Sequence, residues 1–403
     1  MNSNPYRIAT YVLIMVITFI CEVLGEENNG TTIATMNVVR YLRSKGHEVN
    51  IVCPDADKEG EEGYYVVPRI HFGIFDGYVQ SNGVTLASAK AFKDERLLSL
   101  IKRSDIIHFN FGSKLTMLCA KYAHENGIPC TASFHTQAEN FTNHVGLMRN
   151  PLANFLIYCI LNHRLFSQVD AIHYPTEFMR SIFRRNHSTM AKEYVISNGT
   201  SSIFSREEVE RPKEFEGKII ITSTGRYSIE KQQKTLLKAM KYSRHNDIIQ
   251  LIFAGEGPQR KNMERMAKKY CVNKPVFGFH NREELAKILN YTDLYVHCSY
   301  ADLEAIGCLE AISVGITPIL SNSPLSAVSG FALDPRNIYH HDEPQNLALK
   351  IDYWIEHPKE RKENANRYLG MAKQFDLEMM MEKMEAMFLE TIEEYKEKHR
   401  KSE

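Results

Sequence analysis

The feature of this sequence that most constrains its fold is a regular alternation of short apolar strands with amphipathic helices, which occurs twice along the chain. Strands that alternate with helices in this way form parallel sheets covered by helices on both faces. We therefore predict an α/β protein with two doubly wound, Rossmann-like domains. The first comprises residues 1–200 and the second residues 218–375, with a charged, proline-containing linker over residues 201–217. We expect residues 376–403 to form a helix that returns to the first domain.

Length and composition agree with this fold and exclude some classes of function. A chain of 403 residues suits two domains of ordinary size. Its formal net charge is zero and it has no basic tail, so we expect no nucleic-acid partner. The eight cysteines form no C-x-x-C pair, and several lie in apolar runs. This pattern favours reduced core cysteines in a cytoplasmic protein rather than a zinc site or a disulfide framework.

The apolar run Tyr11–Leu24 is open to two interpretations. It is shorter than the roughly 20 residues of a membrane-spanning helix, and Glu22 interrupts it. A signal peptide would need a more basic start than Arg7 alone provides, and a clear cleavage site. We predict a buried first strand over Arg7–Met15, and an anchor or signal within residues 11–24 is the alternative.

The stretch Tyr300–Ile319 has the clearest functional pattern in the chain. Apolar residues recur at helical spacing from Ile306, so a helix begins there. The first backbone N–H groups, near Ala305 and Ile306, carry the positive end of the helix dipole and suit a phosphate. Asp302 precedes the helix and Glu310 lies within it, where we expect both carboxylates to accept hydroxyl groups. In the alternative, Asp302 is only an N-cap and Glu310 only an ion-paired helix residue.

Other polar and aromatic residues follow the predicted strands of the second array. They are Arg226, Lys231, Gly255, Glu256, Gly257 and Phe279. Since the carboxyl ends of parallel strands share one edge of a sheet, we expect these residues at a common ligand site facing the cleft between the domains. Arginine and lysine there favour a phosphate, although a solvated face is the alternative. In the first array Gly30 opens a helix, where the backbone can approach a diphosphate closely.

Several segments occur in an order and spacing typical of one enzyme family. The longer ones are TGRYSIEKQQKTLLKAM, FAGEGP and DLEAIGCLEAISVG, and the shorter ones are KGHEVNIVCPD, DIIHFNFG, SFHTQ and VISNG. Together they resemble family 4 of the retaining glycosyltransferases, and in particular its bacterial diacylglycerol glucosyltransferase-like members. The resemblance covers nearly the whole chain and implies the GT-B fold, in which two Rossmann-like domains face each other across a cleft.

The resemblance also implies an activity. It predicts transfer of a hexose from a nucleotide-sugar, most often UDP-linked, to an acceptor hydroxyl, with retention and without a cofactor or a protein-bound metal. It places Arg226 and Lys231 on the diphosphate, and the N–H groups near Ala305 and Ile306 on phosphate and sugar. Glu310 would then hold the ribose hydroxyls.

Two further roles follow from the same resemblance. His135 matches the family's active-site histidine, which lies near the transferred sugar. The family's first acid, which contacts the donor sugar, is usually glutamate; here Asp302 takes its place, and Glu304 is the alternative.

The acceptor remains open between a membrane glycerolipid and a glycan. For a lipid, the apolar segment Pro151–Phe166 and the arginine-containing helix after it would contact the cytoplasmic face of a membrane. In the alternative, they are a core helix and a solvated face. A UDP-sugar epimerase of the same fold and a non-catalytic nucleotide-sugar-binding protein are the competing functions. A dehydrogenase is disfavoured because no G-x-G-x-x-G follows the first strand.

Overall fold

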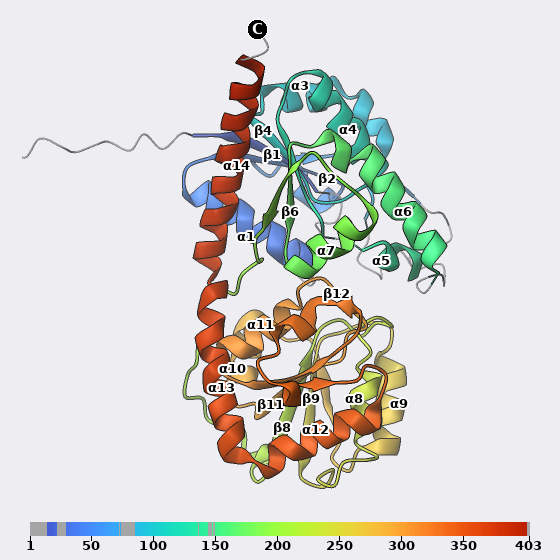
Figure 1. The fold of residues 1–403 in the computed structure, drawn as a ribbon, viewed down its shortest axis with the longest axis vertical. Helices are drawn as coiled ribbons and strands as arrows, with labels where there is room; N and C mark the ends of the chain where they lie inside the picture. The colour runs from blue at the N-terminus through green and yellow to red at the C-terminus, as the bar shows by residue number, and fades with distance from the viewer. Residues whose placement is uncertain are drawn as a thin grey trace, which may run out of the picture.

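The chain is built around two parallel sheets that lie one above the other, each with helices on both faces (Figure 1). The computed structural model describes residues 14–21, 30–71, 73, 85–135, 137–143, 147 and 150–400. Every pair of neighbouring strands in the two large sheets is parallel. The predicted doubly wound α/β fold is therefore confirmed.

The first sheet has seven strands in the order β3-β2-β1-β4-β5-β6-β7. Its strands are β1 (Val16–Ile20), β2 (Glu48–Cys53), β3 (Tyr64–Val66), β4 (Ile106–Phe109), β5 (Cys130–Ser133), β6 (Ala171–Tyr174) and β7 (Lys192–Val195). Its helices are α1 (Gly30–Ser44), α3 (Glu95–Arg103), α4 (Lys114–Glu125), α5 (Ala138–Asn143), α6 (Pro151–Arg164) and α7 (Glu177–Asn186). The central strands are buried on both faces, as continuous apolar runs predict for a covered parallel sheet.

The second sheet has six strands in the order β10-β9-β8-β11-β13-β15. Its strands are β8 (Ile219–Thr224), β9 (Ile249–Ala254), β10 (Val276–Gly278), β11 (Leu294–His297), β13 (Thr317–Ser321) and β15 (Ile338–Tyr339). Its helices are α8 (Lys234–Ala239), α9 (Arg260–Tyr270), α10 (Arg282–Asn290), α11 (Ile306–Ser313), α12 (Pro344–Glu356) and α13 (Pro358–Ala372). Separately, β12 (Ala301–Asp302) pairs with β14 (Leu325–Ser326) to form a small sheet.

In both large sheets the strand order reverses at one point, between β1 and β4 in the first and between β8 and β11 in the second. Ligands of open α/β sheets bind outside the carboxyl ends of the strands at this switch point. The two switch points face each other, because a Cβ on Gly30 at the start of α1 would lie 3.5 Å from Cδ1 of Ile306 at the start of α11. The fold thus places the two helix N-termini on opposite sides of one interdomain gap.

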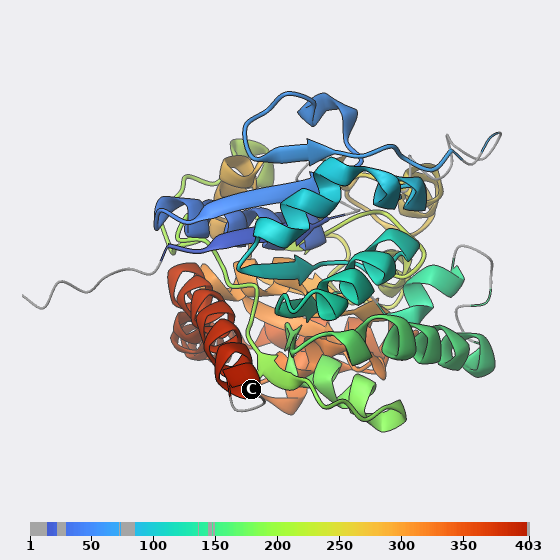
Figure 2. The same cartoon turned by 90° about the horizontal axis from the view of Figure 1, so that it is seen from above.

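The last helix, α14 (Leu377–Arg400), runs from the second domain back along the first (Figures 1 and 2). Its apolar residues share a core cluster with α1, β1 and β2; among them are Met380, Met384 and Phe388. The chain crosses between the domains beside its start, where Thr200 N–H donates to the Phe375 carbonyl at 2.7 Å. Two chain crossings therefore connect the domains.

The first strand among the described residues lies just after the segment that the sequence predicted for it, most of which is outside the described residues. Residues 1–13 are outside the described ranges, and β1 is Val16–Ile20 rather than Arg7–Met15. Residues 17–20 of this strand pair with both β2 and β4, which places β1 next to the middle strand of the sheet. Because the run Tyr11–Leu24 is almost continuously apolar, the sequence does not show where strand pairing begins. Within the described residues, no helix is both long enough and apolar enough to cross a bilayer.

Candidate active site

The carboxyl end of β8 carries the turn that presents Arg226, and two glycines of the next loop hold this turn in place. A Cβ on Gly255 would lie 2.1 Å from the Gly225 carbonyl oxygen, and one on Gly257 would lie 2.6 Å from the Tyr227 carbonyl oxygen. Such contacts with backbone leave no room for a side chain. Both glycines were predicted at the donor site, and in the structure they pack the loop after β9 against the Arg226 turn.

From the sequence we expect Lys231 within the helix that follows the Arg226 turn, but the structure places it in the turn before α8. The reason is Gln232, whose φ of 52° is left-handed, so a continuous right-handed helix cannot pass through it. The Lys231 ammonium instead donates to Oδ2 of Asp302 at 2.5 Å. The turn therefore brings a cation beside the first predicted acid.

Asp302 is the centre of a buried polar network. Its Oδ2 also lies 3.0 Å from Nε2 of His297, which ends β11. Burial opposes ionisation of Asp302, but Lys231 and His297 together hold its pKa well below the usual range. Burial likewise disfavours the charge of Lys231, yet Asp302 outweighs this effect and raises its pKa. The ion pair is therefore fully charged at neutral pH.

Tyr295, which was not among the residues predicted at the site, orients this network. The Tyr295 hydroxyl lies 3.2 Å from Nδ1 of His297 and 2.8 Å from Oγ1 of Thr224. Thr224 ends β8, and a Cβ on Gly307 would lie 2.1 Å from its Oγ1. Glycine at 307 therefore allows the N-terminus of α11 to pack directly on the end of β8.

The turn into α11 is left-handed at Ala305, with φ 61° and ψ 60°. Its N–H donates to Oδ1 of Asp302 at 2.9 Å, so this predicted phosphate donor is already occupied. The next N–H groups, of Ile306 and Gly307, lie in the first helical turn, where an α-helix has no internal acceptor for them. They are the amides that remain for an anion at this edge of the sheet.

The other two predicted acids have different surroundings. Glu310 is buried in α11, and its Oε1 lies 3.4 Å from Nη1 of Arg282. Burial raises the pKa of Glu310 to about 7, and Arg282 offsets part of the effect. Glu304 is also buried, which raises its pKa to about 7, but it faces Asn198 of the first domain. Only Asp302 lies beside Lys231, which favours it over Glu304 for the first-acid role.

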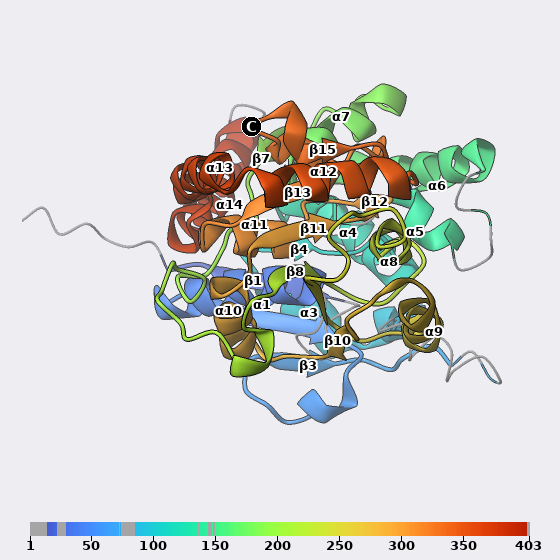
Figure 3. The ribbon, with the colours of Figure 1, turned by 90° about the horizontal axis from the view of Figure 1, so that it is seen from below.

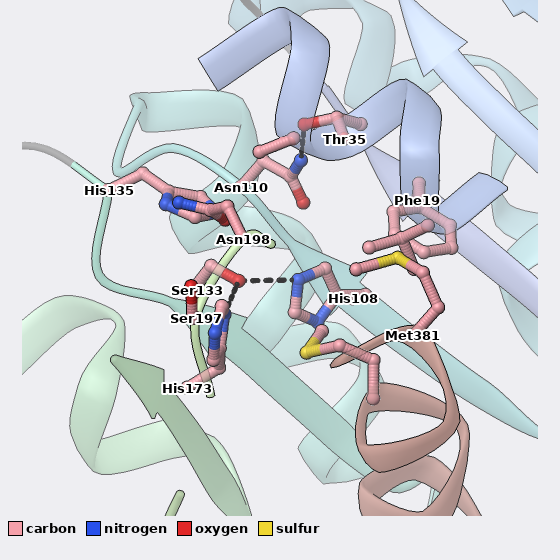
Figure 4. Close-up of a pocket in the computed structure, with 13 residues that line it drawn as sticks. Phe19, Thr35, His108, Asn110, Ser133, His135, His173, Ser197, Asn198 and Met381 are labelled. Atoms are coloured by element: carbon pink, nitrogen blue, oxygen red, sulfur yellow. Dashed lines mark hydrogen bonds between the residues drawn. The ribbon is translucent and has the colours of Figure 1, made fainter. Parts of the chain in front are cut away.

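His135 lies on the first-domain side, after β5, beside a small polar cavity (Figure 4). The cavity measures about 10 Å³, room for about one water molecule. Its wall includes Asn110, whose amide nitrogen donates to Thr35 and whose Oδ1 has no partner among the described residues. Asn198 also lines it, and Figure 4 shows Asn198 next to His135.

Three histidines around this cavity are kept neutral by burial. His108 and His173 each bond the Ser133 hydroxyl at 2.8 Å. Burial lowers the pKa of His135 to about 3 and that of His173 to about 4, and the His108 pKa also lies well below its usual value. His135 is therefore available as a neutral hydrogen-bonding group rather than as a cation.

The remaining predicted residues lie at the periphery of this arrangement. Glu256 forms an ion pair with Arg260 of α9. Phe279 follows β10 and is 59% exposed. Among the described residues, no three His, Cys, Asp or Glu side chains gather closely enough to hold a metal ion.

Two family models match the chain, one on each domain. Residues 28–202 match Glycosyltransferase Family 4, and residues 204–368 match Glycosyl transferases group 1. The chain is a family 4 glycosyltransferase. The identified family agrees with the resemblance predicted from the sequence motifs, and its enzyme class is thereby established.

Named relatives of this glycosyltransferase include a glucosyldiacylglycerol synthase and a mannosyltransferase. It is 25% identical over 309 residues to the alpha-monoglucosyldiacylglycerol synthase of Streptococcus pneumoniae, covering 72% of this chain and 67% of the relative. It is 24% identical over 303 residues to a GDP-mannose-dependent alpha-mannosyltransferase of Corynebacterium glutamicum, covering 72% of this chain and 68% of the relative.

Solved structures confirm the GT-B fold of this glycosyltransferase. Anabaena HepE in complex with UDP and glucose matches with a TM-score of 0.72 and 15% identity, over 93% of this chain and 100% of that one. WaaG, a glycosyltransferase involved in lipopolysaccharide biosynthesis, matches with a TM-score of 0.69 and 14% identity, over 92% and 98% of the two chains. At these identities the likeness establishes the fold alone.

Proposed function

We propose that this glycosyltransferase transfers a hexose from a UDP-sugar to a hydroxyl group of a membrane glycerolipid, with retention of configuration at the anomeric carbon. The observation that carries the proposal is the meeting of Lys231, Asp302 and the N-terminus of α11 at the switch point of the second sheet. The name of the pneumococcal relative, a glucosyldiacylglycerol synthase, supports the choice of a lipid acceptor.

The donor is held by charge complementarity. The diphosphate takes hydrogen bonds from Arg226, Lys231 and the amides of Ile306 and Gly307, which combine side-chain cations with the positive end of a helix dipole. The exposed ring of Phe279 suits stacking on the uracil base.

The carboxylates bind the rings on either side of the diphosphate. Asp302 accepts hydrogen bonds from the transferred sugar, while Lys231 keeps it ionised. Glu310 accepts the ribose hydroxyls from inside α11, where its raised pKa leaves it partly protonated near neutral pH. Neutral His135 donates or accepts a hydrogen bond beside the sugar without adding a charge that would repel the developing positive ring.

The reaction proceeds by front-face attack. The acceptor oxygen bonds to the anomeric carbon on the face from which UDP departs, and the bond from that carbon to the phosphate oxygen breaks. The leaving phosphate oxygen takes the acceptor proton. Negative charge gathers on the diphosphate, where Arg226, Lys231 and the helix N-terminus stabilise it; preorganised donors of this kind typically contribute about a hundredfold or more each.

The test is release of the nucleoside diphosphate from UDP-glucose, UDP-galactose and UDP-N-acetylglucosamine, with GDP-mannose as the contrasting donor. Each donor is incubated with and without phospholipid vesicles that contain diacylglycerol. We expect one UDP-sugar to react, only when the lipid is present, and the anomeric proton coupling of the product to show an α-linked glycolipid. Epimerised UDP-sugar in the absence of lipid, or binding of UDP without turnover under any condition, would refute the transferase proposal in favour of an epimerase or a non-catalytic binding protein.

A lipid acceptor requires contact with a membrane surface, and α6 offers a face for it. Four apolar residues of α6 are between 45% and 66% exposed: Leu152, Phe155, Leu156 and Ile160. Leu152, Leu156 and Ile160 are four residues apart and Phe155 lies beside Leu156, so the four form one apolar stripe. The neighbouring helix α7 exposes Arg184 and Arg185. An apolar stripe beside cations matches an anionic membrane surface, and α6 lies at the rim of the first domain (Figure 1).

Flotation with vesicles containing phosphatidylglycerol tests this contact. The double variant Leu156→Glu/Ile160→Glu is expected to lose most of its vesicle binding while keeping its fold. Leu349→Glu is a matched control, because Leu349 is 64% exposed on α12 at the far end of the second domain (Figure 3). Equal flotation of the wild type and the α6 variant would contradict docking through α6.

A further inference from the structure

The segment that carries Asp302, together with the strand paired to it, accepts side-chain hydrogen bonds from the first domain. Donors of the first domain that follow β5, β6 and β7 reach the region of β12 and β14. These contacts are Gln137 Nε2 to the Leu325 carbonyl at 3.1 Å, Thr176 Oγ1 to the Leu303 carbonyl at 2.9 Å, and Asn198 to the Glu304 carboxylate. The small β12–β14 sheet is thus seated on the strand ends of the opposite domain, where Figure 1 shows it beside α7.

The third contact is the strongest of these. Both oxygens of Glu304 lie within 3.2 Å of the Asn198 N–H, and Oε2 accepts from Asn198 Nδ2 at 2.6 Å. Glu304 is only 2% exposed, and within the described part of the chain no lysine or arginine pairs with it. Its carboxyl group is instead hydrogen-bonded by two adjacent residues of the other domain, Asn198 and the side chain of Ser197, which makes the contact specific.

Both ends of this contact adjoin the proposed reaction centre. On the donor side, Glu304 stands between Asp302 and Ala305, whose left-handed conformation aims the amides of α11. A non-glycine residue keeps such a conformation only where its surroundings enforce it. On the acceptor side, Asn198 shares the wall of the polar cavity with His135.

We propose that Glu304 is a positioning residue that, by holding Asn198, fixes the turn from Asp302 to Ile306 and so completes the donor site only when the two domains are in contact. The inference rests on the proposed function, because it concerns the site assigned to the nucleotide-sugar. Glu304 itself touches neither the diphosphate nor the sugar in this scheme, and acts through Asp302 and Ala305.

The test is an exchange of the two partners. Glu304→Gln places an amide against the Asn198 amide, and Asn198→Asp places two carboxylates face to face, so each single variant loses a charge-assisted hydrogen bond. We expect a fall in kcat/KM of roughly ten- to a hundredfold for Glu304→Gln, carried by both kcat and the KM for the nucleotide-sugar, and a larger fall for Asn198→Asp.

The double variant Glu304→Gln/Asn198→Asp restores the contact, because the glutamine amide donates to the new carboxylate while its oxygen accepts the backbone N–H of position 198. We expect it to recover most of the lost kcat/KM. Wild-type kinetics in Glu304→Gln would overturn the proposal, and so would a folded double variant that loses as much as the two single variants combined.

Small-angle X-ray scattering separates failure of this inference from failure of the proposed function, since it needs no substrate. The radius of gyration of Glu304→Gln is expected to exceed that of the wild type, and the double variant to return to the wild-type value. An unchanged radius of gyration in Glu304→Gln would overturn the domain contact even in an active enzyme. An expanded Glu304→Gln alongside a wild type that turns over no nucleotide-sugar would support the contact and refute only the function.

Discussion

Replacing Lys231 by methionine separates the two roles that the structure gives this side chain. The change keeps most of the length of the side chain but removes the ammonium group that lies 2.5 Å from Asp302. Among the described residues, Asp302 then keeps the His297 ring and the Ala305 N–H as partners, while its side chain is only 9% exposed to solvent. Both the folded state and the proposed reaction are expected to lose free energy.

The two losses have different sizes and sources. Removing one member of a fully buried ion pair costs about 3–5 kcal/mol of unfolding free energy. Because the Lys231 side chain is 26% exposed, solvent screens the pair, and we expect about 1–3 kcal/mol. The loss of a cation from the diphosphate is expected to lower kcat by roughly a hundredfold, equivalent to about 2.7 kcal/mol.

A second substitution distinguishes these effects. In Lys231→Met/Asp302→Asn the unpaired carboxylate is gone, so most of the stability is expected to return, while turnover stays low. Urea unfolding, fitted with the same m-value for all variants, measures the stability, and the initial rate with the reactive UDP-sugar measures the turnover. Wild-type turnover in Lys231→Met would refute the placement of this cation on the diphosphate, and a double variant no more stable than Lys231→Met would refute the ion-pair reasoning.

Three further variants test neighbouring parts of the site. Gly307→Ala places a methyl group 2.1 Å from Oγ1 of Thr224 and is expected to cost about 2 kcal/mol or more of stability and to weaken UDP binding in calorimetry; wild-type UDP affinity would contradict this packing. Ala305→Gly removes the left-handed alanine and is expected to raise the free energy of unfolding by up to about 1 kcal/mol, seen as a higher urea midpoint, with turnover retained. A lower midpoint would show that the turn is not strained. The third variant, Glu310→Gln, tests the raised pKa of Glu310. The unfolding free energy of the wild type, relative to that of the variant, is expected to fall by about 2 kcal/mol between pH 5 and pH 8, because a carboxyl group whose folded-state pKa is raised to about 7 stabilises the fold at low pH and loses this effect as pH rises through that value. A difference that does not change with pH would refute the raised pKa.

The sequence predicted two parallel sheets, because short β-branched runs that alternate with helices are typical of such sheets. It did not predict the short strands β3 and β15 at the edges of the two sheets. Two other differences have local causes. The first strand lay within a uniformly apolar run that gives no register, and Lys231 followed a helical pattern that the left-handed Gln232 interrupts. Neither a missing polar boundary nor a single left-handed residue can be recognised from residue types alone.

The candidate site was predicted as a set of residues but not as a network. Asp302, Lys231 and Ile306 were expected near one another from their places after strands, and the structure brings them together. His297 and Tyr295 were missed, although a histidine at the carboxyl end of a predicted strand was a usable signal. The contact between Glu304 and Asn198 could not be predicted, because it depends on how two separately folded domains meet.

A crystal structure with UDP bound tests most directly whether the switch point of the second sheet binds the diphosphate of a nucleotide-sugar. The predicted result has diphosphate oxygens within hydrogen-bond distance of the Lys231 ammonium and of the Ile306 and Gly307 amides, with the ribose hydroxyls on Glu310. A diphosphate bound elsewhere, with the Lys231–Asp302 pair and the start of α11 untouched, would contradict it.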